Sequence, residues 1–257
     1  VLGYEDEKQY LKNPLYLGST VGRYANRINR GMFTLNGEKI KLPRNNNDHH
    51  LHGGYKGFSS KPWEVSEHSS NRIVFSLISP HFDENYPSLL STIVAYDINE
   101  KNELNINFNA KAQEDTILNL THHSYFNLNH NVSDNILDHE LKIYADKITE
   151  INSDLIPTGK FLDVINTPLD FRKGAIIGER IASNFNQIEY GHGYDHNYVI
   201  NNFDPKVSKI AAELTSHRTG IKMHVKTDLP GIQFYSGNFL DGSFKGKNNQ
   251  KLKKYSG

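Results

Sequence analysis

The sequence predicts an all-β fold. Apolar residues alternate with polar ones in several segments of the 257-residue chain, as half-buried strands require, and helical periodicity is scarce. The segments are short and are separated by Asn, Gly and Pro turns, which is typical of a sandwich or a barrel. No linker and no internal repeat interrupts them. We therefore expect one all-β domain over residues 1–257.

The first clear strands are expected before residue 111. NRIVFSLISP (71–80) predicts a strand that ends at Pro80, because proline cannot donate to a sheet ladder. STIVAYDI (91–98) and ELNINFNA (103–110) alternate in the same way and are joined by a short polar loop, so together they predict a hairpin.

The second half of the chain repeats this pattern. ELKIYADKITEI (140–151) is expected to form one strand, and residues 221–225 another, after the turn-like SHRTG at 216–220. The best helix candidate is GAIIGERIASNF (174–185), and it is short.

Composition narrows the function classes. Lys plus Arg and Asp plus Glu number 29 each, and this neutrality argues against a nucleic-acid partner. No apolar stretch approaches the roughly 18 residues of a membrane span, so no membrane partner is expected. The absence of cysteine excludes disulfides and thiolate nucleophiles. Since the first ten residues also lack the features of a signal peptide, we expect a cytoplasmic protein.

The first polar cluster lies between residues 22 and 54. His50 and His52 are two residues apart, so on a strand both would point to one face. Two imidazoles on one face can bind a metal ion or hydrogen-bond a polyhydroxyl ligand. The following glycine pair allows a tight turn or a close backbone approach. A strand-end turn with partly exposed histidines is the plain structural alternative.

The second cluster is NLTHHSYFNL (119–128). On a strand, His122 and His123 face opposite ways, so at most one of them points readily into a common pocket. A histidine beside aromatic rings can donate or accept a proton near neutral pH. A purely structural histidine is the alternative.

The third cluster combines GYDHNY (193–198) with PGIQFYSGNFLDG (230–242). Asp195 supplies a carboxylate and Gln233 an amide, and aromatic rings flank both. Sugar hydroxyls need paired donors and acceptors, and rings cover the C–H faces of a sugar. These residue types therefore suit a sugar site, although a turn or capping role explains Asp195 equally simply.

Six motifs in order resemble the galactose mutarotase (aldose 1-epimerase) family. The family pattern is carried by GRYANRI with GMFTLNGEKIKL, LHGG-KGF, LTHHSYFNL, DLIPTGKFLDVINTPLDFRK, GYDHNYVI and PGIQFYSGNFLDG. They extend over essentially the whole chain. The resemblance implies a large antiparallel β-sandwich of the galactose mutarotase type that acts on free hexoses and needs no cofactor. It also implies a small-molecule sugar as the partner.

The resemblance assigns roles to six residues. His123 matches the catalytic acid, and His52 matches the other active-site histidine, near the sugar ring oxygen. The remaining matches bind sugar, namely Asn26, Arg27, Asp195 and Gln233. His122 departs from the family, which usually has Asn there, and we expect it to point away from the pocket.

The implied mechanism pairs the acid with a glutamate base. In the family that glutamate follows a YSG motif by a few residues, and here YSG occupies residues 255–257. No glutamate of the chain stands in a matching motif, so the base is assigned to none of them. Because the opening VLGY also matches a point inside the family sequence and is not an initiator Met, we expect the first and the last strands of the fold to lie outside residues 1–257.

Three other functions remain open at this point. One is a sugar-binding relative without catalysis, and another is the mutarotase domain of a bifunctional UDP-galactose 4-epimerase. The third is a metal site built from His50, His52, His123 and Asp195 in a β-sandwich hydrolase or dioxygenase. Sugar preference and oligomeric state cannot be read from the motifs.

Overall fold

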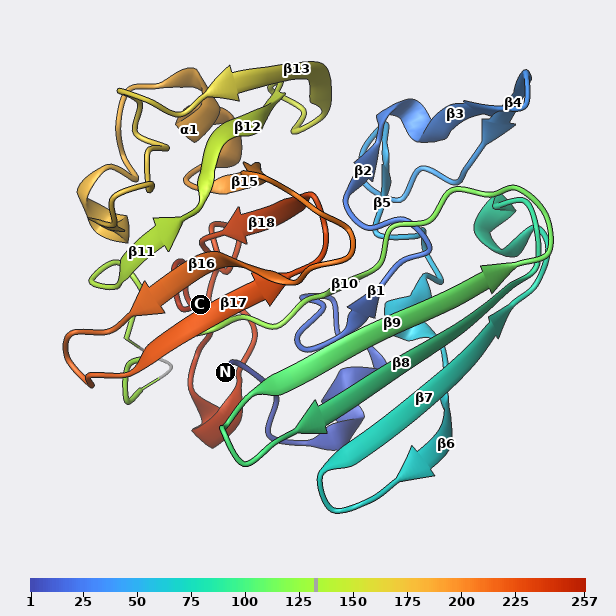
Figure 1. Ribbon diagram of the computed structural model, residues 1–257, viewed down its shortest axis with the longest axis horizontal. Coiled ribbons are helices and arrows are strands. Elements are labelled where there is room, and N and C mark those ends of the chain that lie inside the picture. Colours follow the sequence, from blue (N-terminus) through green and yellow to red (C-terminus); the bar gives the residue numbers. More distant parts are fainter. Residues whose placement is uncertain (132–133) are drawn as a thin grey trace. The chain divides into compact units, whose positions relative to one another are not determined.

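The computed structural model describes residues 1–131 and 134–257. These residues fold into two compact units. The N-unit is Leu11–His123, and the C-unit is Ser124–Gly257 together with Val1–Tyr10. Every pair of named strands in the described residues is antiparallel, and strands dominate both units, so the predicted all-β class is confirmed (Figure 1). The expectation of one domain stays a prediction.

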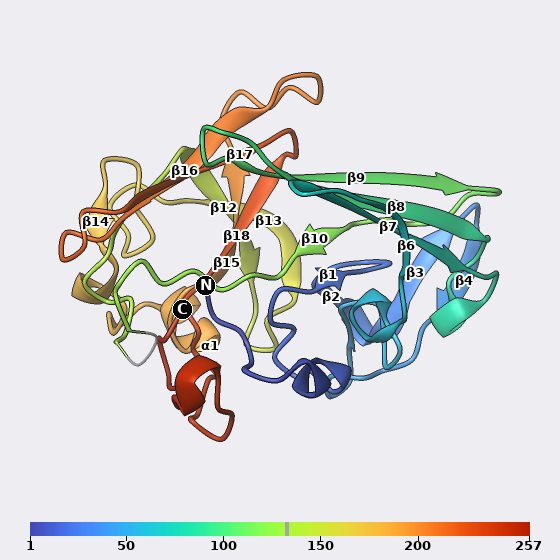
Figure 2. The same cartoon turned by 90° about the horizontal axis from the view of Figure 1, so that it is seen from below.

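The N-unit contains one sheet of four strands that follow one another in the chain. They are β6 (Glu64–His68), β7 (Arg72–Ser79), β8 (Leu90–Ile98) and β9 (Leu104–Ala112). Figure 2 shows this sheet close to edge-on. The strand ending before Pro80 and the β8–β9 hairpin confirm the sequence predictions. Phe108 and Ala110 of β9 pack on a small core formed by Phe58, Leu90 and Leu120.

Three two-stranded ladders complete the strands of the N-unit. They pair β1 (Thr20–Val21) with β10 (Thr121–His122), β2 (Arg27–Ile28) with β5 (His50–Leu51), and β3 (Met32–Leu35) with β4 (Glu38–Lys41). The first two ladders contain or adjoin the two histidine motifs.

The C-unit is a sandwich of two four-stranded sheets. One sheet has the order β14 (Ala175–Ile176), β11 (Glu140–Ile143), β16 (Lys209–Thr215) and β17 (Lys222–Thr227). The other has the order β13 (Pro157–Asp163), β12 (Ala145–Ile151), β15 (Asp195–Ile200) and β18 (Gly231–Tyr235). Buried residues of both sheets form one core, among them Ile143, Leu214, Ile148 and Tyr198.

The segment 140–151 corrects a sequence prediction. It forms two strands in different sheets, β11 and β12, with a break at Tyr144. Leu141, Ile143 and Ala145 are all buried, as the alternation predicts. Apolar periodicity indicates only which residues are buried. It therefore cannot predict that the chain passes from one sheet of the sandwich to the other. The strand near residues 221–225 is confirmed as β17.

The predicted helix at 174–185 is wrong. Ala175 and Ile176 form β14, which pairs with the edge of β11, and a 3₁₀ turn follows. A Cβ on Gly178 would lie 2.8 Å from the carbonyl oxygen of Leu137, so the chain runs close to a neighbouring segment there. Sheet pairing outweighs the weak helical pattern. The helix comes later, as α1 (Asn186–Gly191).

Single 3₁₀ turns account for the other helical residues described. They are η1 (Glu7–Leu11), η2 (Asn29–Gly31), η3 (Phe58–Ser60), η4 (Asp83–Asn85), η5 (Ile177–Glu179) and η6 (Lys247–Asn249). Within residues 1–131 and 134–257, no helix has the length and apolar character to cross a membrane.

Candidate active site

His52 is held by Asn26 through two hydrogen bonds. The His52 backbone amide donates to the Asn26 backbone carbonyl oxygen at 3.1 Å, and the Asn26 backbone amide donates to His52 Nδ1 at 3.0 Å. Because Nδ1 accepts, the proton of the neutral imidazole belongs on Nε2. His52 can thus donate a hydrogen bond from Nε2 to an oxygen of a ligand.

His123 lies beside His52 in the N-unit. The two ring centroids are 5.5 Å apart with the planes nearly perpendicular, at 87°. The ring of Tyr16 contacts both, with centroid distances of 4.8 Å to His52 and 5.7 Å to His123. The structure therefore brings together the two histidines to which the sequence assigns catalysis, and adds a tyrosine that sequence reasoning missed.

His50 does not share a face with His52, so that expectation is wrong. Strand β5 ends at Leu51, and His52 has a left-handed backbone with φ 54°. His50 is fully buried, where its Nε2 lies 2.6 Å from the hydroxyl of Tyr86 and its Nδ1 lies 2.7 Å from the carbonyl oxygen of Pro43. These contacts give His50 a structural role in the core.

His122 and His123 diverge as the strand geometry predicts. His122 ends β10 and packs against Tyr96, with ring centroids 5.5 Å apart, whereas His123 packs against His52 and Tyr16. In the described residues, no group of three His, Asp or Glu side chains could hold a metal ion.

Arg27 lies at the start of β2. Its Nε donates to the side-chain oxygen of Asn46 at 3.3 Å, and its backbone amide donates to the side-chain oxygen of Asn26 at 2.9 Å. Across the ladder, Arg27 pairs with Leu51, the residue before His52. The sequence neighbours Asn26 and Arg27 are thus held next to the LHGG motif.

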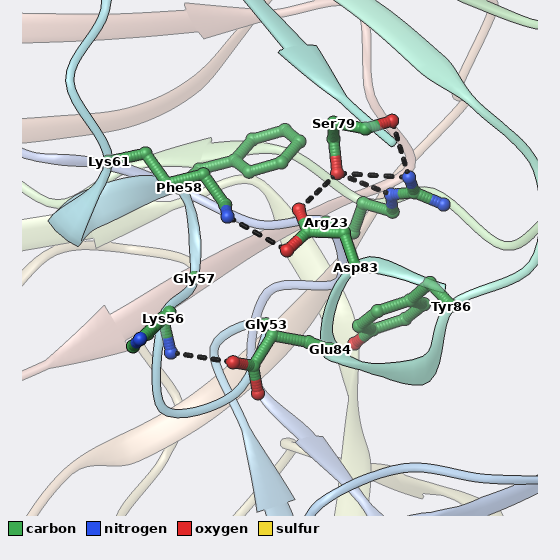
Figure 3. A pocket seen from close by; sticks show the side chains of 10 residues that line it. All are labelled: Arg23, Gly53, Lys56, Gly57, Phe58, Lys61, Ser79, Asp83, Glu84 and Tyr86. Atoms are coloured by element: carbon green, nitrogen blue, oxygen red, sulfur yellow. Dashed lines mark hydrogen bonds and ion pairs between the residues drawn. The ribbon is translucent and has the colours of Figure 1, made fainter. Parts of the chain in front are cut away.

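The turn after His52 is fastened by Glu84. The two carboxylate oxygens of Glu84 accept hydrogen bonds from the backbone amides of Tyr55 and Lys56, each at 3.0 Å. Figure 3 shows the bond from Lys56. The loop that carries Glu84 is in turn fixed by Arg23, which is 1% exposed and donates to the carbonyl oxygens of Ser79 and Pro87. Buried charge that is fully hydrogen-bonded can rigidify such a loop.

Asp195 and Gln233 contact each other in the C-unit. Gln233 Nε2 donates to Asp195 Oδ1 at 2.8 Å across the β15–β18 pair. Burial alternates along β15, so Asp195 and Asn197 face away from the core while His196 and Tyr198 point into it. The carboxylate and the amide predicted from two separate motifs are therefore neighbours on one polar face.

The turn before Asp195 is held by buried polar groups. Asn238, from the segment after β18, donates to the carbonyl oxygens of Gly191 at 2.7 Å and Tyr194 at 2.8 Å. Gly193 has φ 134°, and a Cβ there would lie 2.4 Å from Asn238 Oδ1, so glycine is required. The SGN sequence of the last motif thus has a structural role.

Burial keeps both candidate histidines uncharged near neutral pH. Burial, reinforced by His123 and Arg27, lowers the pKa of His52 to about 3. Burial also lowers the pKa of His123 to about 4, against a backbone hydrogen bond that raises it. Burial raises the pKa of Tyr16, so this ring stays neutral as well.

Comparison with known proteins gives the family. The family model for aldose 1-epimerase matches residues 1–257. Over 257 residues the chain is 42% identical to the galactose mutarotase of Sus scrofa and 40% identical to that of Rattus norvegicus, covering 100% of this chain and 72% of each relative. The aldose 1-epimerase of Haemophilus influenzae is 36% identical, over 91% of this chain and 67% of that protein.

Solved structures agree. An aldose epimerase homologue from C. elegans superposes with a TM-score of 0.89 at 30% identity, covering 100% of this chain and 75% of that one. A galactose 1-epimerase from Lactobacillus acidophilus gives a TM-score of 0.86 at 29% identity, over 99% of this chain and 73% of that one. The chain belongs to the aldose 1-epimerase family.

Proposed function

We propose that the protein is an aldose 1-epimerase that interconverts the α and β anomers of free aldohexoses such as galactose and glucose. The observation that carries this proposal is the match of the whole chain to the family, with 42% identity to a galactose mutarotase. Two imidazoles centred 5.5 Å apart suit the acid/base chemistry that the reaction needs.

The reaction requires two proton transfers and no redox change. A base removes the proton from the anomeric hydroxyl, the bond between C1 and the ring oxygen breaks, and an acid protonates that oxygen. The open aldehyde rotates about its C1–C2 bond, and the reverse steps close the ring on the other face. Because the product is an isomer of the substrate, acid and base regain their starting protonation in each cycle.

We assign the acid to His123 and a hydrogen-bonding role to His52. The hydrogen bond from the Asn26 backbone amide to Nδ1 leaves the proton of neutral His52 on Nε2, so this imidazole suits donation to a sugar oxygen. His123 is the imidazole left to transfer the proton. Since burial lowers its pKa to about 4, the acid role requires a nearby carboxylate that raises this pKa. The glutamate base implied by the resemblance is such a group.

Asp195 and Gln233 are proposed to bind sugar hydroxyls. Gln233 Nε2 donates to one carboxylate oxygen of Asp195, so a carboxylate and an amide lie side by side, and both group types can hydrogen-bond sugar hydroxyls. Asn26 and Arg27 are proposed to bind sugar as well. A cytoplasmic location is part of the proposal and fits the cysteine-free composition.

Polarimetry tests this function directly. Freshly dissolved α-galactose is added to the protein as its gene encodes it, and the approach to the equilibrium rotation is followed. We expect a rate well above that of buffer, and a loss of about a hundredfold or more in kcat for His123→Ala. The matched control is His68→Ala, because His68 is an exposed histidine of β6 in the same unit.

A second candidate is sugar binding without catalysis. The low pKa values of His52 and His123 favour it, because two neutral imidazoles can bind hydroxyls without transferring a proton. Saturable galactose binding in calorimetry together with a buffer rate in polarimetry would support this candidate and overturn the first.

A further inference from the structure

The turn at residues 13–19 presents the half-buried ring of Tyr16 to the two candidate histidines. Tyr16 meets His52 edge to face, with planes at 64°, and lies tilted against His123 at 34°. The two imidazoles also contact each other, with ring centroids 5.5 Å apart. Tyr16 is thus a shared wall of both rings.

Asn13 fixes the backbone of this turn. Its side chain accepts from the Leu17 amide at 2.9 Å and donates to the Leu17 carbonyl oxygen at 3.0 Å and to the Ser19 hydroxyl at 2.9 Å. Asn13 is 8% exposed, so these bonds are shielded from water. They hold Tyr16 in a left-handed conformation with φ 57°, which a tyrosine rarely adopts.

The same turn is bonded to the backbone of His123. The Gly18 amide donates to the His123 carbonyl oxygen at 3.1 Å, and the His123 amide donates to the Ser19 carbonyl oxygen at 2.9 Å. A shift of the turn would therefore move His123 as well as the ring of Tyr16. Strained backbone that neighbouring contacts over-determine is often found where geometry serves function.

We propose that Tyr16 is a positioning residue that fixes the edge-on arrangement of His52 and His123 and excludes water from the side they share. The ring of Tyr16 performs this role, and its phenolic hydroxyl is dispensable. The importance of the ring for turnover rests on the proposed epimerase function. The effect of the ring on the two imidazoles follows from packing alone and is independent of that function.

Proton NMR titration of the histidine resonances is the central test. In the protein without substitutions, burial is expected to hold the pKa values of both His52 and His123 below the ordinary value of histidine. Tyr16→Leu opens the shared wall to water, so both pKa values should rise toward the ordinary value of about 6.5. Tyr16→Phe keeps the ring and should leave both titrations unchanged. Tyr55→Leu is the control, because Tyr55 is 68% exposed.

Asn13→Ala provides a second route to the same result. This variant keeps the ring and releases the turn, so both pKa values should rise, by less than in Tyr16→Leu. Circular dichroism reports whether each variant is folded. A folded Tyr16→Leu protein with both histidine titrations unchanged would overturn the proposal, and so would a Tyr16→Phe protein that behaves like Tyr16→Leu.

Activity separates this proposal from the proposed function. If the parent protein interconverts galactose anomers, kcat for Tyr16→Leu should fall about tenfold or more, while Tyr16→Phe stays within about threefold, because misplacing catalytic groups slows proton transfer. If the protein without substitutions shows no turnover, the epimerase proposal is overturned but the proposal for Tyr16 is not. The titrations then still decide the role of Tyr16.

Discussion

His52 and Asn26 hold each other in conformations that each would avoid alone. Both have left-handed backbones, with φ 54° and φ 66°, and their two mutual hydrogen bonds maintain this geometry. Strain at a candidate site supports a functional reading, because the fold retains it against its cost of roughly 1–3 kcal/mol per residue. His50, two residues earlier, shows ordinary core packing by contrast.

The carboxylate–amide pair leads to a prediction about substrate affinity. Gln233→Ala removes the donor that orients Asp195 Oδ1 and one proposed contact to sugar. Since this contact is expected in ground and transition states alike, KM should rise about tenfold with little change in kcat. Steady-state polarimetry measures both constants, and Gln113→Ala, an exposed residue of the N-unit, is the control. A fall in kcat at unchanged KM would contradict the assignment.

Sequence motifs predicted some residues of the candidate site and missed others. Period-2 alternation and the order of motifs identified Asp195, Gln233 and the divergence of His122 from His123. Tyr16 was missed because its proposed role depends on contact with His123, about a hundred residues later in the chain. An Asn-Pro pair at 13–14 marks that turn in the sequence but says nothing about its partner.

At the scale of elements, the sequence predicted where several strands lie but not how they pair into sheets. Alternation reports which residues are buried, so β7, β8, β9 and β17 were found. It says nothing of pairing, so the break at Tyr144 between two sheets was invisible. The helix at 174–185 failed for a related reason, because pairing with β11 decides the conformation of Ala175 and Ile176.

The LHGG turn depends on a glycine that has no space for a side chain. A Cβ at Gly53 would lie 1.9 Å from the carbonyl oxygen of Gly22, and its φ is 86°. Gly53→Ala should therefore destabilise the protein by several kcal/mol and abolish turnover. Gly37→Ala is the matched control, because its φ of 83° carries similar strain but nothing lies within 4 Å. Urea unfolding measures both, and equal losses would contradict the close-packing argument.

Glu84 links two loops, so its loss should affect function from a distance. Glu84→Ala leaves the Tyr55 and Lys56 amides to water, at a cost of about 1–2 kcal/mol. The loosened turn should also lower kcat severalfold through His52. Glu84→Gln keeps one acceptor oxygen, so its stability and its kcat should lie between those of Glu84→Ala and those of the protein without substitutions. Thermal unfolding and polarimetry on both variants check this, with Glu38→Ala of β4 as the exposed control. Unchanged activity in Glu84→Ala would remove Glu84 from the support of His52.

For the whole molecule, each unit contains its own group of the residues that are proposed to act on or bind sugar. The N-unit supplies the imidazoles with Asn26 and Arg27, and the C-unit supplies the carboxylate–amide pair. Each group is fixed within its own unit, by the Asn26–His52 bonds in one and by the sandwich face of β15 in the other. The family match extends over residues 1–257 and therefore over both units.

Buried histidines should make stability depend on pH. Burial lowers the pKa of His196 to about 4, and that of the unfolded chain is about 6.5. Between these values the unfolded state binds more protons, so the free energy of unfolding should fall as the pH drops from about 6.5 to about 4 and stay constant above that window. His196 alone contributes roughly 3 kcal/mol, and the partly exposed His52 and His123 contribute less.

Urea unfolding at a series of pH values measures this loss. The same curve is expected for His68→Gln, because that side chain is exposed in β6. A free energy of unfolding that is constant between pH 7 and pH 4 would show that these histidines are not buried in their neutral form.

Exchange between the two anomeric protons of galactose at equilibrium is the most direct test of the epimerase proposal. Two-dimensional exchange NMR records the transfer of magnetisation between the α and β anomers without any change in composition. We predict exchange cross-peaks that appear when the protein is added, persist in His68→Ala and vanish in His123→Ala. An exchange rate equal to that of buffer, or one that His123→Ala leaves intact, would contradict the account.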